Sequence, residues 1–89
     1  MNEARIQLIE RLLKEEFRPQ ELLVKDQSHL HAGHAGAKDG RGHFDVSIVA
    51  EAFRGVAPLK RHRMVFEALG ELLQTDIHAL RIKASSPDE

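Results

Sequence analysis

The 89-residue chain contains no cysteine, no tryptophan and no tyrosine. Without cysteine it can form no disulfide, it offers no thiol nucleophile, and it cannot by itself hold an all-thiolate zinc or iron–sulfur centre. Aromatic residues make up only 4% of the chain, which leaves few surfaces on which the bases of single-stranded nucleic acid could stack. Any metal site must therefore use other ligands, and any sulfur ligand must come from a partner.

The chain also lacks an excess of charge of either sign and any long apolar run. Its 13 basic and 14 acidic side chains give a net charge of −1, whereas nucleic-acid binding usually shows as strong basicity. The longest apolar runs, such as 48–50, are far too short to cross a bilayer, and the first residues do not resemble a signal peptide. We expect a cytoplasmic protein without membrane association.

The apolar residues follow helical and strand spacings in turn, which predicts a small α+β domain. Residues 1–89 suffice for a single domain, with an ordered core over about 3–84. The predicted elements are a helix over 3–16, strands over 21–27 and 43–50, a short helical turn over 51–54, a long helix over 59–74 and a strand over 77–84. A long loop over 28–42 separates the first two strands, and 85–89 form a short polar tail.

The order helix, strand, strand, short helix, helix, strand predicts a three-stranded mixed sheet. A helical connection between 43–50 and 77–84 makes those two strands parallel, whereas the loop at 28–42 suits an antiparallel hairpin. Both long helices have an apolar stripe, and each stripe is buried if the helices cover the same face of the sheet. We therefore expect a two-layer fold.

The chain has six histidines, and His29, His31 and His34 lie close together in the predicted loop. Histidine is the commonest metal ligand and titrates near neutral pH, so the loop is a candidate metal site. A local zinc site of three imidazoles is one interpretation, although a glycine-rich loop without carboxylates specifies such a site weakly. His62 falls in the apolar stripe of the long helix, between Leu59 and Phe66, so we expect it to pack beneath the helix with them. His43 opens a strand, and we expect a structural role for it too.

Four basic residues, Arg54, Lys60, Arg61 and Arg63, gather near the start of the predicted long helix. Basic side chains at a helix N-terminus suit contacts with phosphate. The same group could instead dock the carboxylates of a partner or form an ordinary solvated face. KH domains clamp nucleic acid with a Gly-x-x-Gly loop between two helices, and this connection carries only Gly55. The cluster is thus a candidate for nucleic-acid binding or partner docking.

Short motifs along the chain recur in the same order in one known family. They are Asp26-Gln27-Ser28 followed by His31, Gly42-His43-Phe44, Phe53-Arg54-Gly55, Arg61-His62-Arg63 and Ile77-His78-Ala79-Leu80. From about residue 5 to residue 87 the chain resembles the BolA family. The resemblance implies a fold like that of class II KH domains, in agreement with the element order, and a monothiol glutaredoxin as the partner.

In that family the two proteins share a [2Fe–2S] cluster, so the resemblance also implies a cofactor and its ligands. The matching ligand at the start of the last strand is His78, and the second comes from the loop, where His31 or His34 fits. A glutaredoxin cysteine and a bound glutathione would supply the sulfur ligands, since histidine can replace cysteine at one iron of such a cluster. The isolated chain would hold no cofactor and would be a monomer or a weak homodimer.

Two functions of different kinds follow from these features. The first is a non-enzymatic adaptor that binds a monothiol glutaredoxin and co-ligates the cluster, in iron–sulfur trafficking or iron sensing. The alternative is a KH-like DNA- or RNA-binding transcriptional regulator that acts through the basic cluster. We do not expect an enzyme, because the chain has no recognisable serine–histidine–acid arrangement, phosphate loop or metalloprotease motif.

Overall fold

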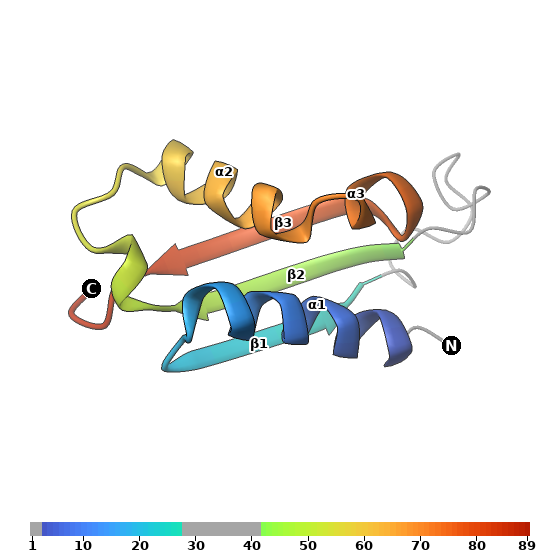
Figure 1. The fold of residues 1–89 in the computed structure, drawn as a ribbon, viewed down its shortest axis with the longest axis horizontal. Helices are drawn as coiled ribbons and strands as arrows, with labels where there is room; N and C mark the ends of the chain where they lie inside the picture. The colour runs from blue at the N-terminus through green and yellow to red at the C-terminus, as the bar shows by residue number, and fades with distance from the viewer. Residues whose placement is uncertain (1–2, 28–41) are drawn as a thin grey trace.

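The helices and strands follow one another in the predicted order, with one helix divided in two (Figure 1). The structure is a computed structural model, and it describes residues 3–27 and 42–89. The elements are α1 (Glu3–Phe17), β1 (Glu21–Asp26), β2 (Gly42–Val49), the 3-10 turn η3 (Glu51–Phe53), α2 (Pro58–Leu69), α3 (Leu72–Thr75) and β3 (Ile77–Ser85). The predicted α+β fold is confirmed.

The strands form one three-stranded mixed sheet in the order β1-β2-β3. β1 and β2 are antiparallel, with Leu23 opposite Ser47. β2 and β3 are parallel, with Asp45 opposite Arg81. Parallel strands need a long crossover connection, and η3, α2 and α3 together supply it.

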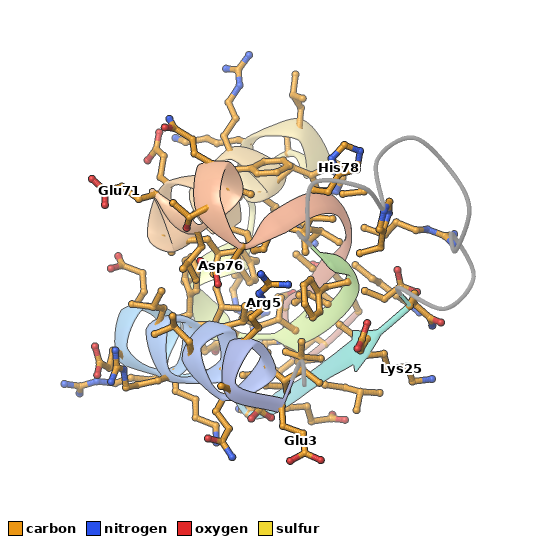
Figure 2. The ribbon with its side chains drawn as sticks, turned by 90° about the vertical axis from the view of Figure 1, so that its right-hand side faces the viewer. Glu3, Arg5, Lys25, Glu71, Asp76 and His78 are labelled. Carbon is orange, nitrogen blue, oxygen red and sulfur yellow. The ribbon has the colours of Figure 1, made fainter. Side chains whose placement is uncertain are left out.

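Helices α1 and α2 cover one face of the sheet, and the core lies between the helices and the strands (Figure 2). From Phe44 onward, alternate residues of β2 are buried, namely Phe44, Val46 and Ile48, as expected for a strand with one covered face. The rings of Phe17 and Phe53 lie 5.0 Å apart, so η3 is anchored against α1. The other buried apolar residues are Ile9, Leu13, Val24, Ala50, Val65, Leu69 and Ile77.

The predicted helix over 59–74 is in fact two helices that meet at Gly70. Gly70 has a φ of +52° and a ψ of −122°, and its N–H donates to the Phe66 carbonyl oxygen at 3.0 Å as α2 ends. Residues with a side chain rarely adopt this combination of angles. The prediction of one continuous helix is wrong because the apolar spacing continues across the glycine whereas the helical backbone does not.

The buried face of α2 also differs from the predicted stripe. The sequence predicts that Leu59 and Phe66 belong to the core, but their exposed fractions are 65% and 37%. His62, predicted to pack beneath the helix, is only half-buried. Because the buried residues are spaced by four, they lie on one side of the helix. They are Arg61, Val65 and Leu69.

The C-terminal residues pack against the domain more closely than predicted. β3 continues to Ser85, one residue beyond the predicted strand, and Ser86 is only 4% exposed. The Glu89 carboxylate accepts hydrogen bonds from the Ser86 backbone N–H and from the Ser86 hydroxyl, at 3.1 and 2.6 Å. The packed core thus extends past residue 84, because the polar groups of the tail pair with one another and with a buried arginine.

Candidate metal site and basic surface

His78, the predicted cluster ligand, is exposed at the beginning of β3 (Figure 2). The preceding residue, Ile77, is only 2% exposed and belongs to the core. The pairing of β2 with β3 then becomes irregular, because Gly42 lies opposite Ile77 but His43 lies opposite Ala79. His78 is the residue that this register passes over. Irregularities of this kind redirect a side chain, and here the buried Ile77 is followed at once by an exposed imidazole.

A second histidine lies beside His78. The ring centroids of His43 and His78 are 5.0 Å apart, with the ring planes inclined at 56°. His43 is 6% exposed, which agrees with the structural role predicted for it, whereas His78 faces outward. The pair exists because parallel strands begin at the same end of a sheet, and each of these two histidines is the second residue of its strand.

The start of β3 is held in place by a polar anchor from α1. The Arg5 guanidinium contacts the Asp76 carboxylate, with Nε 3.1 Å from Oδ2. The Thr75 hydroxyl donates to the other carboxylate oxygen of Asp76 at 2.5 Å. Both contacts hold the pKa of Asp76 below its usual value, and the Thr75 hydrogen bond contributes more than the hydrogen bond from Arg5. The backbone just before His78 is therefore tied to a helix on the covered face.

The segment that carries the remaining predicted ligands starts and ends near the two histidines. On its N-terminal side, the Gln27 N–H donates to the His43 carbonyl oxygen at 2.7 Å. On its C-terminal side, the Gly42 N–H donates to the Asp76 carbonyl oxygen at 2.9 Å. Both attachment points lie where β3 begins. The predicted ligands of that segment lie outside the described residues: His29, His31 and His34.

Arg61, predicted to contact phosphate or a partner, is buried and forms its contacts within the domain. It is 9% exposed. Its Nε donates to the Val56 carbonyl oxygen at 2.7 Å, and a terminal nitrogen donates to the Ala84 carbonyl oxygen at 2.8 Å. The two terminal nitrogens also bind both oxygens of the Glu89 carboxylate, at 2.7 and 2.6 Å. Together with Ser86, this lowers the pKa of Glu89 to about 2.

The other members of the predicted basic cluster have different environments. Arg54 contacts the Glu51 carboxylate within η3 and donates to Asp88 at 2.7 Å. Lys60 and Arg63 are exposed on α2, and neither makes an ion pair with a described carboxylate. The structure therefore does not unite the four residues into one basic surface. Two of the arginines organise the chain's own acidic C-terminal residues, and Lys60 and Arg63 remain available to a ligand.

Comparison with known proteins decides the family. A model of the family described as BolA-like protein matches residues 4–89. The chain belongs to the BolA family. Protein BOLA1, chloroplastic, of Arabidopsis thaliana is 46% identical over 80 residues, which span 86% of this chain and 50% of that protein. The DNA-binding transcriptional regulator BolA of Haemophilus influenzae is 34% identical over 83 residues, which span 93% of this chain and 78% of that protein.

Solved structures place the same fold in other BolA proteins. The BolA domain of SufE1 from Arabidopsis thaliana superposes with a TM-score of 0.85 at 39% identity, covering 96% of this chain and 94% of that one. The agreement extends over almost the whole domain, so the arrangement of helices on one sheet face is common to both. The chain spans only half the length of the plant BOLA1 protein that it matches.

In this BolA domain, the described residues bring two imidazoles together but not a complete metal site. Between 3 and 27 and between 42 and 89, no group of three or more histidine or acidic side chains is placed to hold a metal ion. A cluster shared with a partner requires fewer ligands from this chain, because each protein then supplies only part of the ligand set. Sequence reasoning missed that His43 lies next to His78. The parallel pairing of their strands was the signal that could have revealed it.

Proposed function

We propose that this BolA-family chain is a non-enzymatic adaptor that binds a monothiol glutaredoxin and supplies histidine to a shared [2Fe–2S] cluster. The observation that carries the proposal is the exposed imidazole of His78 at the beginning of β3. An imidazole can bind a metal ion, and this one belongs to a residue whose backbone is part of β3 and whose side chain is accessible to a partner. Iron sensing and iron–sulfur trafficking both follow from such an adaptor.

The donor set fits a shared cluster better than a self-contained one. A [2Fe–2S] cluster has four ligands, and histidine can replace thiolate at one iron. The chain has no cysteine, so the thiolates would come from the glutaredoxin and from glutathione. His78 would be one ligand of this chain, and His31 or His34 would be the other. The bound cluster would supply electron transfer or iron–sulfur transfer, while the isolated chain would hold no cofactor.

The arrangement around His78 supports this role in two ways. The anchor between Arg5 and Asp76 ties the strand start to α1, so the imidazole is presented from a rigid backbone. A ligand held on a regular element is placed more accurately than one held on a loop. In addition, the described residues that flank positions 28–41, Gln27 and Gly42, are hydrogen-bonded to His43 and Asp76 beside His78.

The test is a pair of matched histidine substitutions in the complex. The chain is co-expressed with a monothiol glutaredoxin, and ultraviolet–visible and EPR spectra of the purified complex are compared with those of the glutaredoxin alone. We expect a distinct spectrum that is lost with His78→Ala and retained with His62→Ala, since His62 lies on α2 away from the proposed site. An unchanged cluster spectrum in His78→Ala removes His78 from the site.

The identity of the second ligand requires its own comparison. We expect one of the substitutions His31→Ala and His34→Ala to alter the EPR spectrum of the complex and the other to leave it unchanged. Equilibrium dialysis of the isolated chain against zinc distinguishes a ligand of the shared cluster from a ligand of a local zinc site. Micromolar or tighter zinc binding that both substitutions abolish would favour the zinc interpretation instead.

Binding of DNA is the second candidate function, favoured by the exposure of Lys60 and Arg63 and by the name of the Haemophilus influenzae relative. If both side chains contact phosphate, replacing both with glutamine should reduce the slope of log affinity against log salt by roughly 2. Arg61 is unsuitable for this test because it is buried. Absence of DNA binding at low salt would refute the candidate.

The compartment and the oligomeric state of the chain remain predictions. Within the two described ranges, no helix is long and apolar enough to cross a membrane. The names of the plant relatives assign those proteins to the chloroplast or to the chloroplast and mitochondrion. We keep the cytoplasm as the predicted compartment and a monomer or weak homodimer as the predicted state. Fluorescence localisation and sedimentation velocity test the two predictions.

A further inference from the structure

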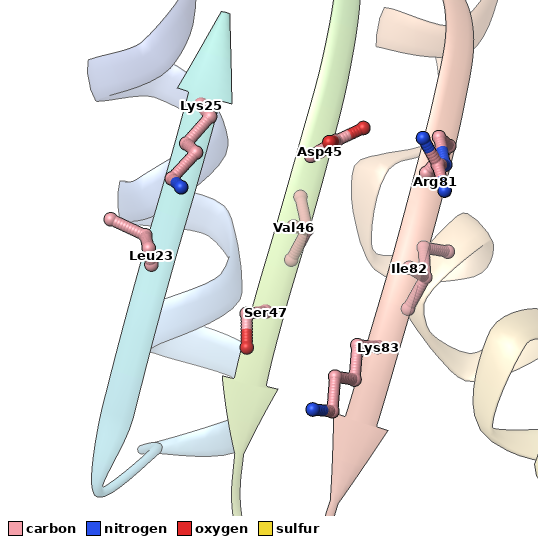
Figure 3. Close-up of a pocket in the computed structure, with 8 residues that line it drawn as sticks. All are labelled: Leu23, Lys25, Asp45, Val46, Ser47, Arg81, Ile82 and Lys83. Atoms are coloured by element: carbon pink, nitrogen blue, oxygen red, sulfur yellow. The ribbon is translucent and has the colours of Figure 1, made fainter.

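None of the described helices covers the face of the sheet opposite α1 and α2, and this face carries a distinct group of side chains. Figure 3 looks onto this face with the helices behind the strands. A hollow of about 380 Å³ lies over it. The residues that line it from the three strands are Leu23, Lys25, Asp45, Val46, Ser47, Arg81, Ile82 and Lys83. The side chains of Val46 and Ile82 point to the core on the other side of the sheet. We call this surface the open sheet face.

Strand register arranges the open sheet face in two cross-strand rows. In the first row Lys25 lies opposite Asp45, and Asp45 lies opposite Arg81. In the second row Leu23 lies opposite Ser47, and Ser47 lies opposite Lys83. Cationic side chains therefore stand on both outer strands, and the central strand contributes one carboxylate and one hydroxyl. Three positive charges face one negative charge, so the hollow favours an anion.

These three cations outnumber the acidic residues that line the hollow, and none of them is in a close ion pair within the described part of the chain. Lys25, Arg81 and Lys83 form no ion pair with a described carboxylate. Among the residues that line the hollow, Asp45 has the one carboxylate, and it accepts a long hydrogen bond from the Gln27 amide at 3.4 Å. By contrast, Arg54 and Arg61 each bind an acidic residue of the C-terminal tail. The charge of the open sheet face is therefore available to an external partner.

We propose that the open sheet face binds an extended acidic segment of a partner protein. Arg81 and Lys83 are two residues apart on one strand, so their side chains are spaced by roughly 6.6–6.8 Å along it. Carboxylates at alternate positions of an extended peptide have the same spacing. Lys25 can meet a further carboxylate across the sheet, while Leu23, 52% exposed, offers apolar contact. Arginine and lysine form charge-assisted hydrogen bonds with carboxylates in such an arrangement.

A single-stranded nucleic acid fits this face less well. Its phosphates repeat at a comparable distance, but sequence-tolerant binding of single strands also uses stacking of bases on aromatic rings. The residues that line the hollow include none. The proposal goes beyond the adaptor function, because neither His78 nor a cluster takes part in it.

The test measures binding of a fluorescent octapeptide of alternating glutamate and threonine to the full chain by anisotropy at low ionic strength. We expect the double substitution Arg81→Gln and Lys83→Gln to weaken binding by roughly twofold to thirtyfold, the combined effect of two exposed charge pairs. The matched control is Arg11→Gln with Lys14→Gln, exposed on α1 over the opposite face. It removes the same charge and should leave the affinity nearly unchanged.

Amide NMR shifts and a competing ligand locate the binding. Peptide addition should shift the amides of Ser47 and Ile82 more than those of α1. Three results would overturn the proposal: no peptide binding at low ionic strength, an equal loss in the control variant, or tighter binding of octathymidylate that depends on Arg81 and Lys83. The last result would assign the face to nucleic acid.

Discussion

Replacing Gly70 by alanine tests the most distinctive backbone feature of the domain. Gly70 ends α2 with a φ of +52° and a ψ of −122°, the angles of the first central residue of a type II′ turn. The next residue, Glu71, has a φ of −64° and a ψ of −20°, and α3 follows. A Cβ added at Gly70 would meet only the Glu67 carbonyl oxygen at 3.8 Å, which is ordinary contact. The effect of alanine is therefore one of backbone conformation and not of steric overlap.

The expected size follows from two opposing effects. Holding a residue with a side chain in a sparsely populated region costs about 1–3 kcal/mol. Alanine also restricts the unfolded chain, which stabilises the fold by about 0.4–1 kcal/mol. We expect a net loss of about 1–2 kcal/mol in the free energy of unfolding, which lowers Tm by about 4–16 °C for a domain of this size.

The sign of the change distinguishes the structure from the sequence prediction. If residues 59–74 formed one continuous helix, Gly70→Ala would stabilise the protein by about 0.5–1 kcal/mol. Urea denaturation of the two proteins measures the difference. A chemically synthesised chain with D-alanine at position 70 is the control, because the mirror image of these angles is a common conformation. Stabilisation by L-alanine, or a loss as large with D-alanine, would refute the reasoning.

Three further predictions concern the core and the C-terminal contacts. The pKa of Glu89 is about 2 in the folded state against an ordinary 4.5, so its contribution to stability is present above about pH 4.5 and is lost as the pH falls toward 2. On acidification, the urea midpoint should therefore fall less in Glu89→Gln than in the unchanged protein. An equal fall in the two proteins would contradict this. Phe53→Ala removes a fully buried ring that packs on Phe17 and should cost about 3–5 kcal/mol in a urea titration, so a loss below about 1 kcal/mol would be inconsistent with the packing. Arg61→Lys cannot reproduce the forked contacts of the guanidinium and should lower the urea midpoint, whereas Arg63→Lys on the exposed side of α2 should not; equal midpoints in the two variants would contradict the assigned role.

The positions of the strands and of α1 followed from local patterns. In β2, the alternation of Phe44, Val46 and Ile48 with polar residues is enough to predict a strand with one buried face. The same kind of pattern was misleading in α2, since Leu59 and Phe66 have helical spacing but lie on its exposed side. Periodicity identifies a helix, and it does not tell which of two neighbouring faces is packed.

In the candidate site, too, the sequence predicted some features and only the packed structure revealed others. His78 was predicted through the family resemblance, and its exposure agrees with a ligand role that remains to be tested. His78 lies close to His43 because of the register between β2 and β3. Since η3, α2 and α3 separate these strands in the chain, the spacing of nearby residues does not predict that register. Arg61 was predicted to face a ligand because other basic residues flank it. Its partner, Glu89, lies 28 positions further along the chain, so the contact exists only once β3 has paired with β2.

Composition and short-range spacing were sufficient to predict a small α+β domain that offers no thiolate ligand, because helix and strand formation depends on neighbours within a few positions. The ordered motifs were sufficient to indicate the BolA family. The orientation of α2, the turn at Gly70, the internal use of Arg61 and the uncovered cations of the sheet became visible only in three dimensions. Each of these depends on which distant segments exclude water from one another, and burial of that kind is a property of the packed chain as a whole.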